Sequence, residues 1–190
     1  MDLDKLTTEQ INGFSAAEGR KALETLREES LHPMEINEAL LMQMLEHNKD
    51  TEFGRKYDFA TIHSIEEYQK RVPVSIYDDY AGDILRMVNN DEDNLITAYD
   101  IGIYCETSGS LGNPKLIPMA KDTMRIHNFY NSGICSGVKA EHLRPEWTKG
   151  RAMMLMECKT VEMKKGKEYG SLSALFMREM KPIVDKISST

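Results

Sequence analysis

The sequence predicts an α/β fold that is rich in helix in its first half and holds a small sheet in its second half. Apolar residues recur at helical spacing through most of residues 1–93. From Asn94 onward, β-branched and aromatic runs alternate with helical segments, which favours three or four strands. The 190 residues are 41% hydrophobic and 29% charged, which is typical of a globular chain with the length of one domain or of part of one.

Helical spacing is the main signal in the first half of the chain. Helices are expected at residues 15–29, 33–47, 63–71 and 75–88. The second of these has the most regular apolar spacing, and Pro33 suits its first turn. The third is expected to begin at Ser64 as its N-cap, with Glu67 completing a capping box. Pro73 disfavours helix in the residue before it, so residues 72–74 are expected to be extended.

The second half mixes strand and helix signals. We expect strands at 95–105 and 115–119, a helix at 121–139, a buried strand at 151–157, an exposed loop at 159–171 and a helix at 172–187. The buried strand is inferred from the apolar block AMMLM, and the exposed loop from its lysines and glycines. Pro182 is expected to interrupt the last helix.

The segment after the first expected strand has the composition of a phosphate-binding loop. Residues 106–117 read ETSGSLGNPKLI. Glycines let backbone N–H groups approach an anion closely, hydroxyls offer further donors, and a lysine supplies positive charge. The residues expected to bind the anion are Thr107, Ser108, Gly109, Ser110, Leu111 through its backbone N–H, Gly112 and Lys115. An exposed turn rich in serine and glycine is the alternative interpretation. The spacings of the Walker A loop and of the dinucleotide fingerprint are absent.

This loop resembles the phosphate loop of the AMP-forming acyl-adenylate superfamily, in which small hydroxyl residues, a glycine, further hydroxyls, a glycine and then Pro-Lys surround the phosphates of ATP. Residues 107–110 and 112–115 match that pattern, whereas Leu111 stands where a third small hydroxyl is usual. Further blocks resemble the auxin-responsive acyl acid amido synthetase family, a branch of the same superfamily. These blocks are residues 48–59, 68–74 with 77–80 and 84–87, and the KLIP of 115–118.

The resemblance implies that the chain is a partial N-terminal, large domain of an adenylate-forming enzyme. In that reading residues 1–93 are mainly helical, and residues 94–190 hold the phosphate loop with strands and helices. The implied enzyme is an AMP-forming ligase that uses ATP, with Mg²⁺, to activate a carboxylic acid as acyl-AMP. It then joins the acyl group to an amine or amino acid, or to a thiol.

Two later motifs of the family are missing from these 190 residues: the acidic motif that holds Mg²⁺ and the aspartate that binds the ribose. We therefore expect the chain alone to lack most of the activity, and we assign no catalytic residue. The alternative is a non-catalytic module, in which the helices of residues 15–90 form an interaction or homo-oligomer surface and the loop is vestigial.

Composition narrows the range of partners and sites. The net charge of −7 argues against nucleic-acid binding, which needs basic residues to neutralise phosphates. No apolar stretch has the length of a membrane span and the first residues are acidic, so no membrane partner and a cytoplasmic location are expected. The three cysteines and five histidines lack the spacing of a metal site, so no metal ligand is expected.

Overall fold

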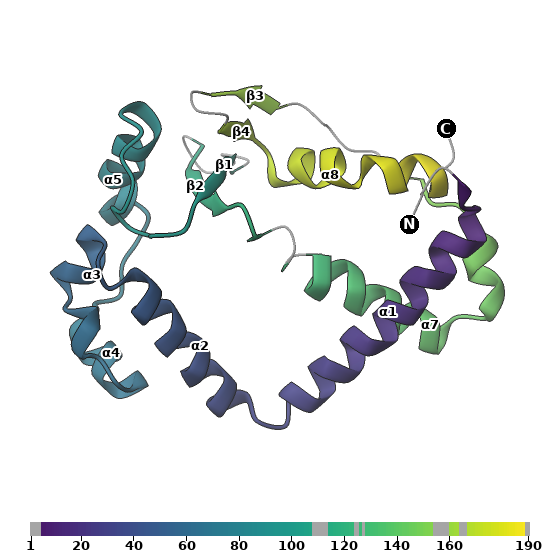
Figure 1. Cartoon of the computed structure of the whole chain (residues 1–190), viewed down its shortest axis with the longest axis horizontal. Helices are drawn as coiled ribbons and strands as arrows, with labels where there is room; N and C mark the ends of the chain where they lie inside the picture. The colour runs from purple at the N-terminus through teal and green to yellow at the C-terminus, as the bar shows by residue number, and fades with distance from the viewer. Residues whose placement is uncertain are drawn as a thin grey trace. The chain divides into compact units, whose positions relative to one another are not determined.

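The fold is described from a computed structural model of the chain (Figure 1). The structure describes residues 5–107, 114–123, 126, 128–153, 160–163 and 167–188. The chain forms two compact units, each of which is assembled from separate stretches of sequence. One unit contains residues 1–31, 122–160 and 170–190, and the other contains residues 32–121 and 161–169. Within the described ranges, no helix is both long and apolar enough to cross a lipid bilayer.

The first unit is helical. Its elements are α1 (Thr8–Glu29), the π-helical segment η3 (Asn128–Gly133), α7 (Ile134–His142), the 3-10 helix η4 (Pro145–Lys149) and α8 (Leu172–Ile187). The helix α1 begins with a reciprocal capping box, because Thr7 accepts from the backbone of Gln10 and the Gln10 side chain accepts from the backbone of Thr7.

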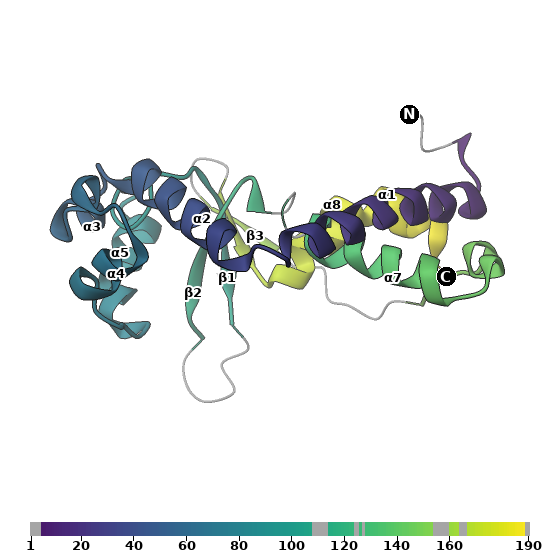
Figure 2. The same cartoon turned by 90° about the horizontal axis from the view of Figure 1, so that it is seen from below.

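The helices α1 and α7 lie side by side in both views (Figures 1 and 2). They touch where Gly19 meets Gly137, and a Cβ built on Gly137 would come within 2.2 Å of the Gly19 carbonyl oxygen. Glycine is required at this crossing because only a hydrogen atom fits between the two backbones. At one end of the interface, Arg27 donates two hydrogen bonds of 2.7 Å to the Glu141 carboxylate.

The second unit combines short helices with the sheet. Its helices are α2 (Pro33–Asn48), α3 (Glu52–Lys56), the 3-10 helix η2 (Phe59–Thr61), α4 (Ile65–Arg71) and α5 (Asp78–Asn89). The helix α3 begins at Thr51, whose fully buried hydroxyl accepts from the Gly54 backbone at 2.8 Å. One hydrophobic core of this unit consists of Leu45, Phe59, Ile62 and Val72.

The sheet follows these helices. Among the described residues it has four strands in the order β2-β1-β4-β3, with β1 at Ile101–Glu106, β2 at Leu116–Ala120, β3 at Thr160–Glu162 and β4 at Glu168–Gly170. Strands β1 and β2 are antiparallel neighbours (Figure 2), and Glu106 pairs with Leu116 at their ends. The second core of the unit packs Tyr104 of β1 against Met87 of α5 and against Leu95.

The expected α/β class is confirmed: the chain is rich in helix, and two strands of one small sheet flank the expected loop. The helices expected at 33–47 and 63–71 are present as α2 and α4, whereas the one expected at 15–29 is longer and begins at Thr8. The helix expected at 75–88 begins only at Asp78. Residues 72–74 are not helical, as expected from Pro73.

Three expectations for the second half are wrong. The strand expected at 95–105 begins only at Ile101, because the carbonyls of Asn94 and Leu95 accept instead from the first amides of α3. The loop expected at 159–171 contains β3 and β4, and Lys167 between them donates to Asp91 at 2.6 Å. Pro182 does not interrupt α8, which is assigned as one helix.

Two further segments are described only in part. Of the strand expected at 151–157, Ala152 makes a single bridge to Ser188 and Met153 is 75% exposed, so these residues form no buried strand. Residues 154–157 lie outside the described residues. The helix expected at 121–139 is π-helical from Asn128 to Gly133 before α7 begins.

Candidate functional site

The mouth of the expected phosphate loop is closed by one backbone–backbone hydrogen bond and one bond from a backbone N–H to a side chain. The Thr107 N–H donates to the Lys115 carbonyl at 3.0 Å, and the Lys115 N–H donates to the Thr107 hydroxyl oxygen at 2.9 Å. The pair extends the β1–β2 ladder by one step, so both residues are placed by strand pairing. The structure therefore brings Thr107 and Lys115 together. Ser108, Gly109, Ser110, Leu111 and Gly112 lie outside the described residues.

Tyr77 fixes the return strand from the side. Its hydroxyl oxygen accepts from the Leu116 N–H at 3.0 Å, and the Lys115 ammonium lies 5.2 Å from the centre of its ring. A cation at this distance is attracted by the electron-rich face of the ring. Tyr77 was not among the residues expected at the site, because it lies 39 residues before Leu116 and carries no local signal of a binding site.

Lys115 has no ion-pair partner in the part of the chain that the structure describes. Lys115 is exposed, and no carboxylate in the described part of the chain lies within ion-pair distance of its ammonium. Glu106, at the end of β1 beside the loop, is instead hydrogen-bonded to the Tyr169 hydroxyl, which raises the pKa of Tyr169. Among the described residues, no carboxylate therefore competes with an anion for the Lys115 ammonium at the mouth of the loop.

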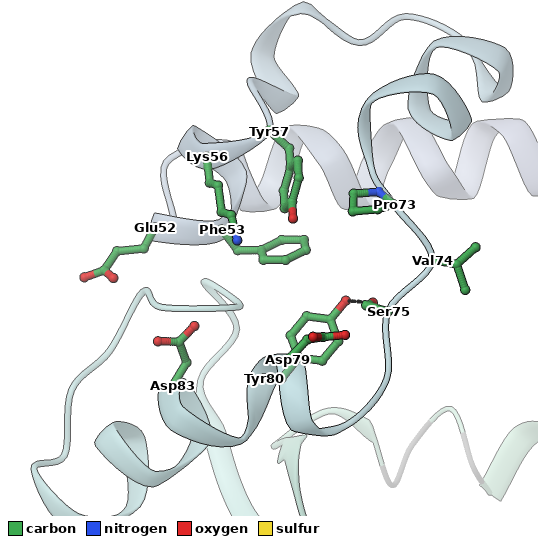
Figure 3. Close-up of a pocket in the computed structure, with 10 residues that line it drawn as sticks. All are labelled: Glu52, Phe53, Lys56, Tyr57, Pro73, Val74, Ser75, Asp79, Tyr80 and Asp83. Atoms are coloured by element: carbon green, nitrogen blue, oxygen red, sulfur yellow. Dashed lines mark hydrogen bonds between the residues drawn. The ribbon is translucent and has the colours of Figure 1, made fainter.

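A cavity of about 510 Å³ lies in the same unit, between α3, the extended segment after α4, and α5 (Figure 3). Figure 3 shows the rings of Phe53, Tyr57 and Tyr80 near one another, whereas the exposed side chain of Val74 points away from them. The remaining lining residues are Glu52, Lys56, Pro73, Ser75, Asp79 and Asp83. Its volume is in the range of small-molecule sites.

The guanidinium of Arg86 binds the acidic side chains at one edge of this cavity. Arg86 binds both oxygens of the Glu52 carboxylate at 2.9 and 3.0 Å, and it contacts Asp83 at 3.2 Å and Glu92 at 2.6 Å. The hydrogen bonds from Arg86 lower the pKa of Glu52 and the pKa of Glu92, and these carboxylates raise the pKa of Arg86. Glu52 and Glu92 therefore stay ionised at neutral pH.

A second, more open hollow of about 330 Å³ adjoins the return strand. It is lined by Phe53, Tyr77, Tyr80, Ile84, Ile96, Leu116, Ile117 and Pro118. Its walls are mostly apolar, and Phe53 and Tyr80 belong to both hollows. In the described ranges, no group of three or more His, Cys, Asp or Glu side chains is arranged to hold a metal ion.

The chain is similar in sequence to known proteins. A profile of the GH3 family N-terminal domain matches residues 22–190. The putative indole-3-acetic acid-amido synthetase GH3.9 of Arabidopsis thaliana is 35% identical over 99 residues, which are 51% of this chain and 17% of that protein. The probable indole-3-acetic acid-amido synthetase GH3.11 of Oryza sativa subsp. japonica is 32% identical over 144 residues, which are 66% of this chain and 24% of that protein.

Solved structures show the same fold. The AtGH3.15 acyl acid amido synthetase in complex with 2,4-DB matches 88% of this chain and 29% of its own chain, with a TM-score of 0.76 and 21% identity. The present chain spans less than a third of the length of these relatives. The resemblance inferred from four sequence blocks is confirmed by these matches. The chain belongs to the GH3 family, whose N-terminal domain it matches over residues 22–190.

Proposed function

We propose that this chain is the phosphate-binding part of an ATP-dependent ligase, which activates a carboxylic acid as acyl-AMP and joins the acyl group to an amino acid or another amine. Two relatives are named indole-3-acetic acid-amido synthetases, and this supports the class of reaction. The observation that carries the proposal is the pairing of Thr107 with Lys115 at the mouth of the loop.

The residues at the mouth suit the phosphates of ATP. The two hydrogen bonds between Thr107 and Lys115 hold the two ends of the loop together, so its amides can converge on one anion. Tyr77 holds the return strand by the Leu116 amide and keeps the Lys115 ammonium over its ring. Lys115 would stabilise the negative charge of a phosphate oxygen, and the loop would orient the phosphates of ATP. ATP, when bound, supplies the phosphorus that the carboxylate attacks and the pyrophosphate that leaves. We assign no described residue to Mg²⁺.

The 190-residue chain is expected to bind ATP weakly and to catalyse almost nothing by itself. Isothermal titration of the chain with ATP and Mg²⁺ tests this expectation. Submicromolar affinity together with ATP–pyrophosphate exchange would show that the chain is sufficient and would contradict it.

The role of Lys115 is tested in the full-length protein. Lys115→Ala is expected to slow ATP–pyrophosphate exchange by about a hundredfold or more, because a preorganised charge near the reacting phosphate is removed. Lys121→Ala is the matched control, because Lys121 follows the same hairpin and only pairs with exposed Asp100 at 3.0 Å. Equal exchange rates in the two variants would refute the role of Lys115.

The cytoplasm is the location we propose. Cys105 is buried and Cys135 is exposed, and both are free thiols. Free thiols of this kind persist in a reducing compartment.

A further inference from the structure

The cavity between α3 and α5 has an aromatic wall on one side. The ring of Phe53 lies 4.8 Å from that of Tyr57 and 5.5 Å from that of Tyr80, measured between centroids, and neither neighbour is stacked flat on it. The rings of Phe53 and Tyr57 meet edge to face, and those of Phe53 and Tyr80 are tilted by 48° (Figure 3). The Tyr80 hydroxyl is hydrogen-bonded to Ser75, which fixes that ring. Such a wall attracts cations through the ring faces and apolar groups through contact.

The charged groups of the cavity are mostly acidic. Glu52, Asp79 and Asp83 line it, and Lys56 is the basic residue among its lining residues. Arg86 lies behind Glu52 and Asp83, but it is shared with a third carboxylate, that of Glu92. Arg55 is a third cation that acts on Glu52, so four carboxylates face three cations in this part of the unit, which leaves a small negative excess that favours a cation.

The ammonium of Lys56 already lies against one ring of the aromatic wall. The ammonium of Lys56 lies 5.1 Å from the centre of the Tyr57 ring, although Lys56 is exposed and its stem is free to turn outward. An ammonium group is therefore compatible with this environment. A ligand with its own ammonium would compete with Lys56 for the ring and would share the field of Asp79 and Asp83.

We propose that this cavity binds a small organic cation, namely an ammonium head with a short apolar tail. The head lies near Tyr57 and the carboxylates of Asp79 and Asp83, and the tail packs on Phe53 and Tyr80. The volume of about 510 Å³ is ample for such a molecule. This site is separate from the loop mouth and does not depend on the proposed ligase activity, because neither Lys115 nor Thr107 lines it.

The binding test uses the 190-residue chain and simple probes. Tetramethylammonium and n-butylammonium are titrated while the aromatic ¹H–¹³C NMR signals of Phe53, Tyr57 and Tyr80 are followed. We expect saturable shifts of these signals for both cations and none for butyrate, which has a similar tail and the opposite charge. Absence of saturable shifts with the cations, or equal shifts with butyrate, would overturn the proposal.

Two surface variants test the sign of the charge effect without disturbing the core. Lys56→Gln removes the competing cation and is expected to tighten n-butylammonium binding by roughly twofold to fivefold. Asp79→Asn is expected to weaken it by a similar factor, while its amide oxygen still accepts from the Ile76 N–H, a bond of 2.8 Å in the native chain. Weaker n-butylammonium binding in Lys56→Gln would show that Lys56 does not compete with the ligand and would overturn the proposal. Circular dichroism verifies that both variants are folded.

Discussion

Replacing Gly137 by alanine is expected to force α1 and α7 apart. The added Cβ would lie 2.2 Å from the carbonyl oxygen of Gly19 and 2.7 Å from its carbonyl carbon, whereas carbon atoms in contact normally lie about 3.5–4.0 Å apart. The obstructing atoms are backbone, so no side chain can turn away and the helices must separate by roughly 1 Å. Overpacking of this kind costs up to about 3 kcal/mol. The higher helix propensity of alanine offsets about 1 kcal/mol of this cost, so the free energy of unfolding is expected to fall by about 2 kcal/mol.

Gly13 provides a matched control on α1, the other helix of the pair. A Cβ on Gly13 would meet nothing within 4 Å, so Gly13→Ala is expected to gain up to about 1 kcal/mol from propensity alone. The measurement is the free energy of unfolding from urea titrations followed by circular dichroism at 222 nm. A Gly137→Ala variant as stable as the native chain, or a Gly13→Ala variant equally destabilised, would refute the close crossing.

Three other substitutions test the second unit. Tyr77→Phe keeps the ring but removes the hydroxyl that accepts from Leu116, so hydrogen exchange of the Leu116 amide should accelerate; unchanged exchange would mean that the bond does not hold the strand. Glu52→Gln should destabilise the unit above about pH 4.5 and have progressively less effect below it. The reason is that Arg86 lowers the pKa of Glu52, so the stabilisation by the ion pair is lost as the carboxylate is protonated. Urea titrations at several pH values measure this, and a difference in unfolding free energy that does not change with pH would mean that the ion pair contributes nothing. Asn48→Ala should cost about 1–3 kcal/mol, because this buried amide accepts from Thr97 and Ala98 and donates to the Met44 carbonyl; a loss within error of zero would count against these bonds.

Local patterns predicted the helices well because the information lies within one or two turns. At the start of α4, the Ser64 hydroxyl accepts from the Glu67 N–H at 3.2 Å, as the capping pattern indicates. The Glu67 carboxylate accepts from His63 rather than from Ser64 itself, which is a shift of one residue from the expected box. The strands on either side of residues 107–115 are present as β1 and β2, while the phosphate-binding role of these residues stays a prediction.

Contacts between distant residues could not be predicted in this way. The Tyr77 bond to Leu116 and the ion pair of Lys167 with Asp91 join residues 39 and 76 positions apart, and neither leaves a periodic trace in the sequence. The strand boundary at Ile101 was missed for a related reason. Leu95 is buried, as a strand residue would be, but it is buried against α5 and the sheet while its carbonyl bonds to α3.

The pairing of α1 with α7 has a consequence for how the chain is made. More than 100 residues separate the end of α1 at Glu29 from the start of α7 at Ile134. At a translation rate of about 5–20 residues per second, α1 leaves the ribosome roughly 5–20 s before its partner exists. Its apolar face, with Ala16, Ala22 and Leu23, has no native cover during that interval. Nascent α1 is therefore the segment of this chain that a chaperone would protect, while residues 32–121 already contain the helices and the β1–β2 hairpin of the other unit.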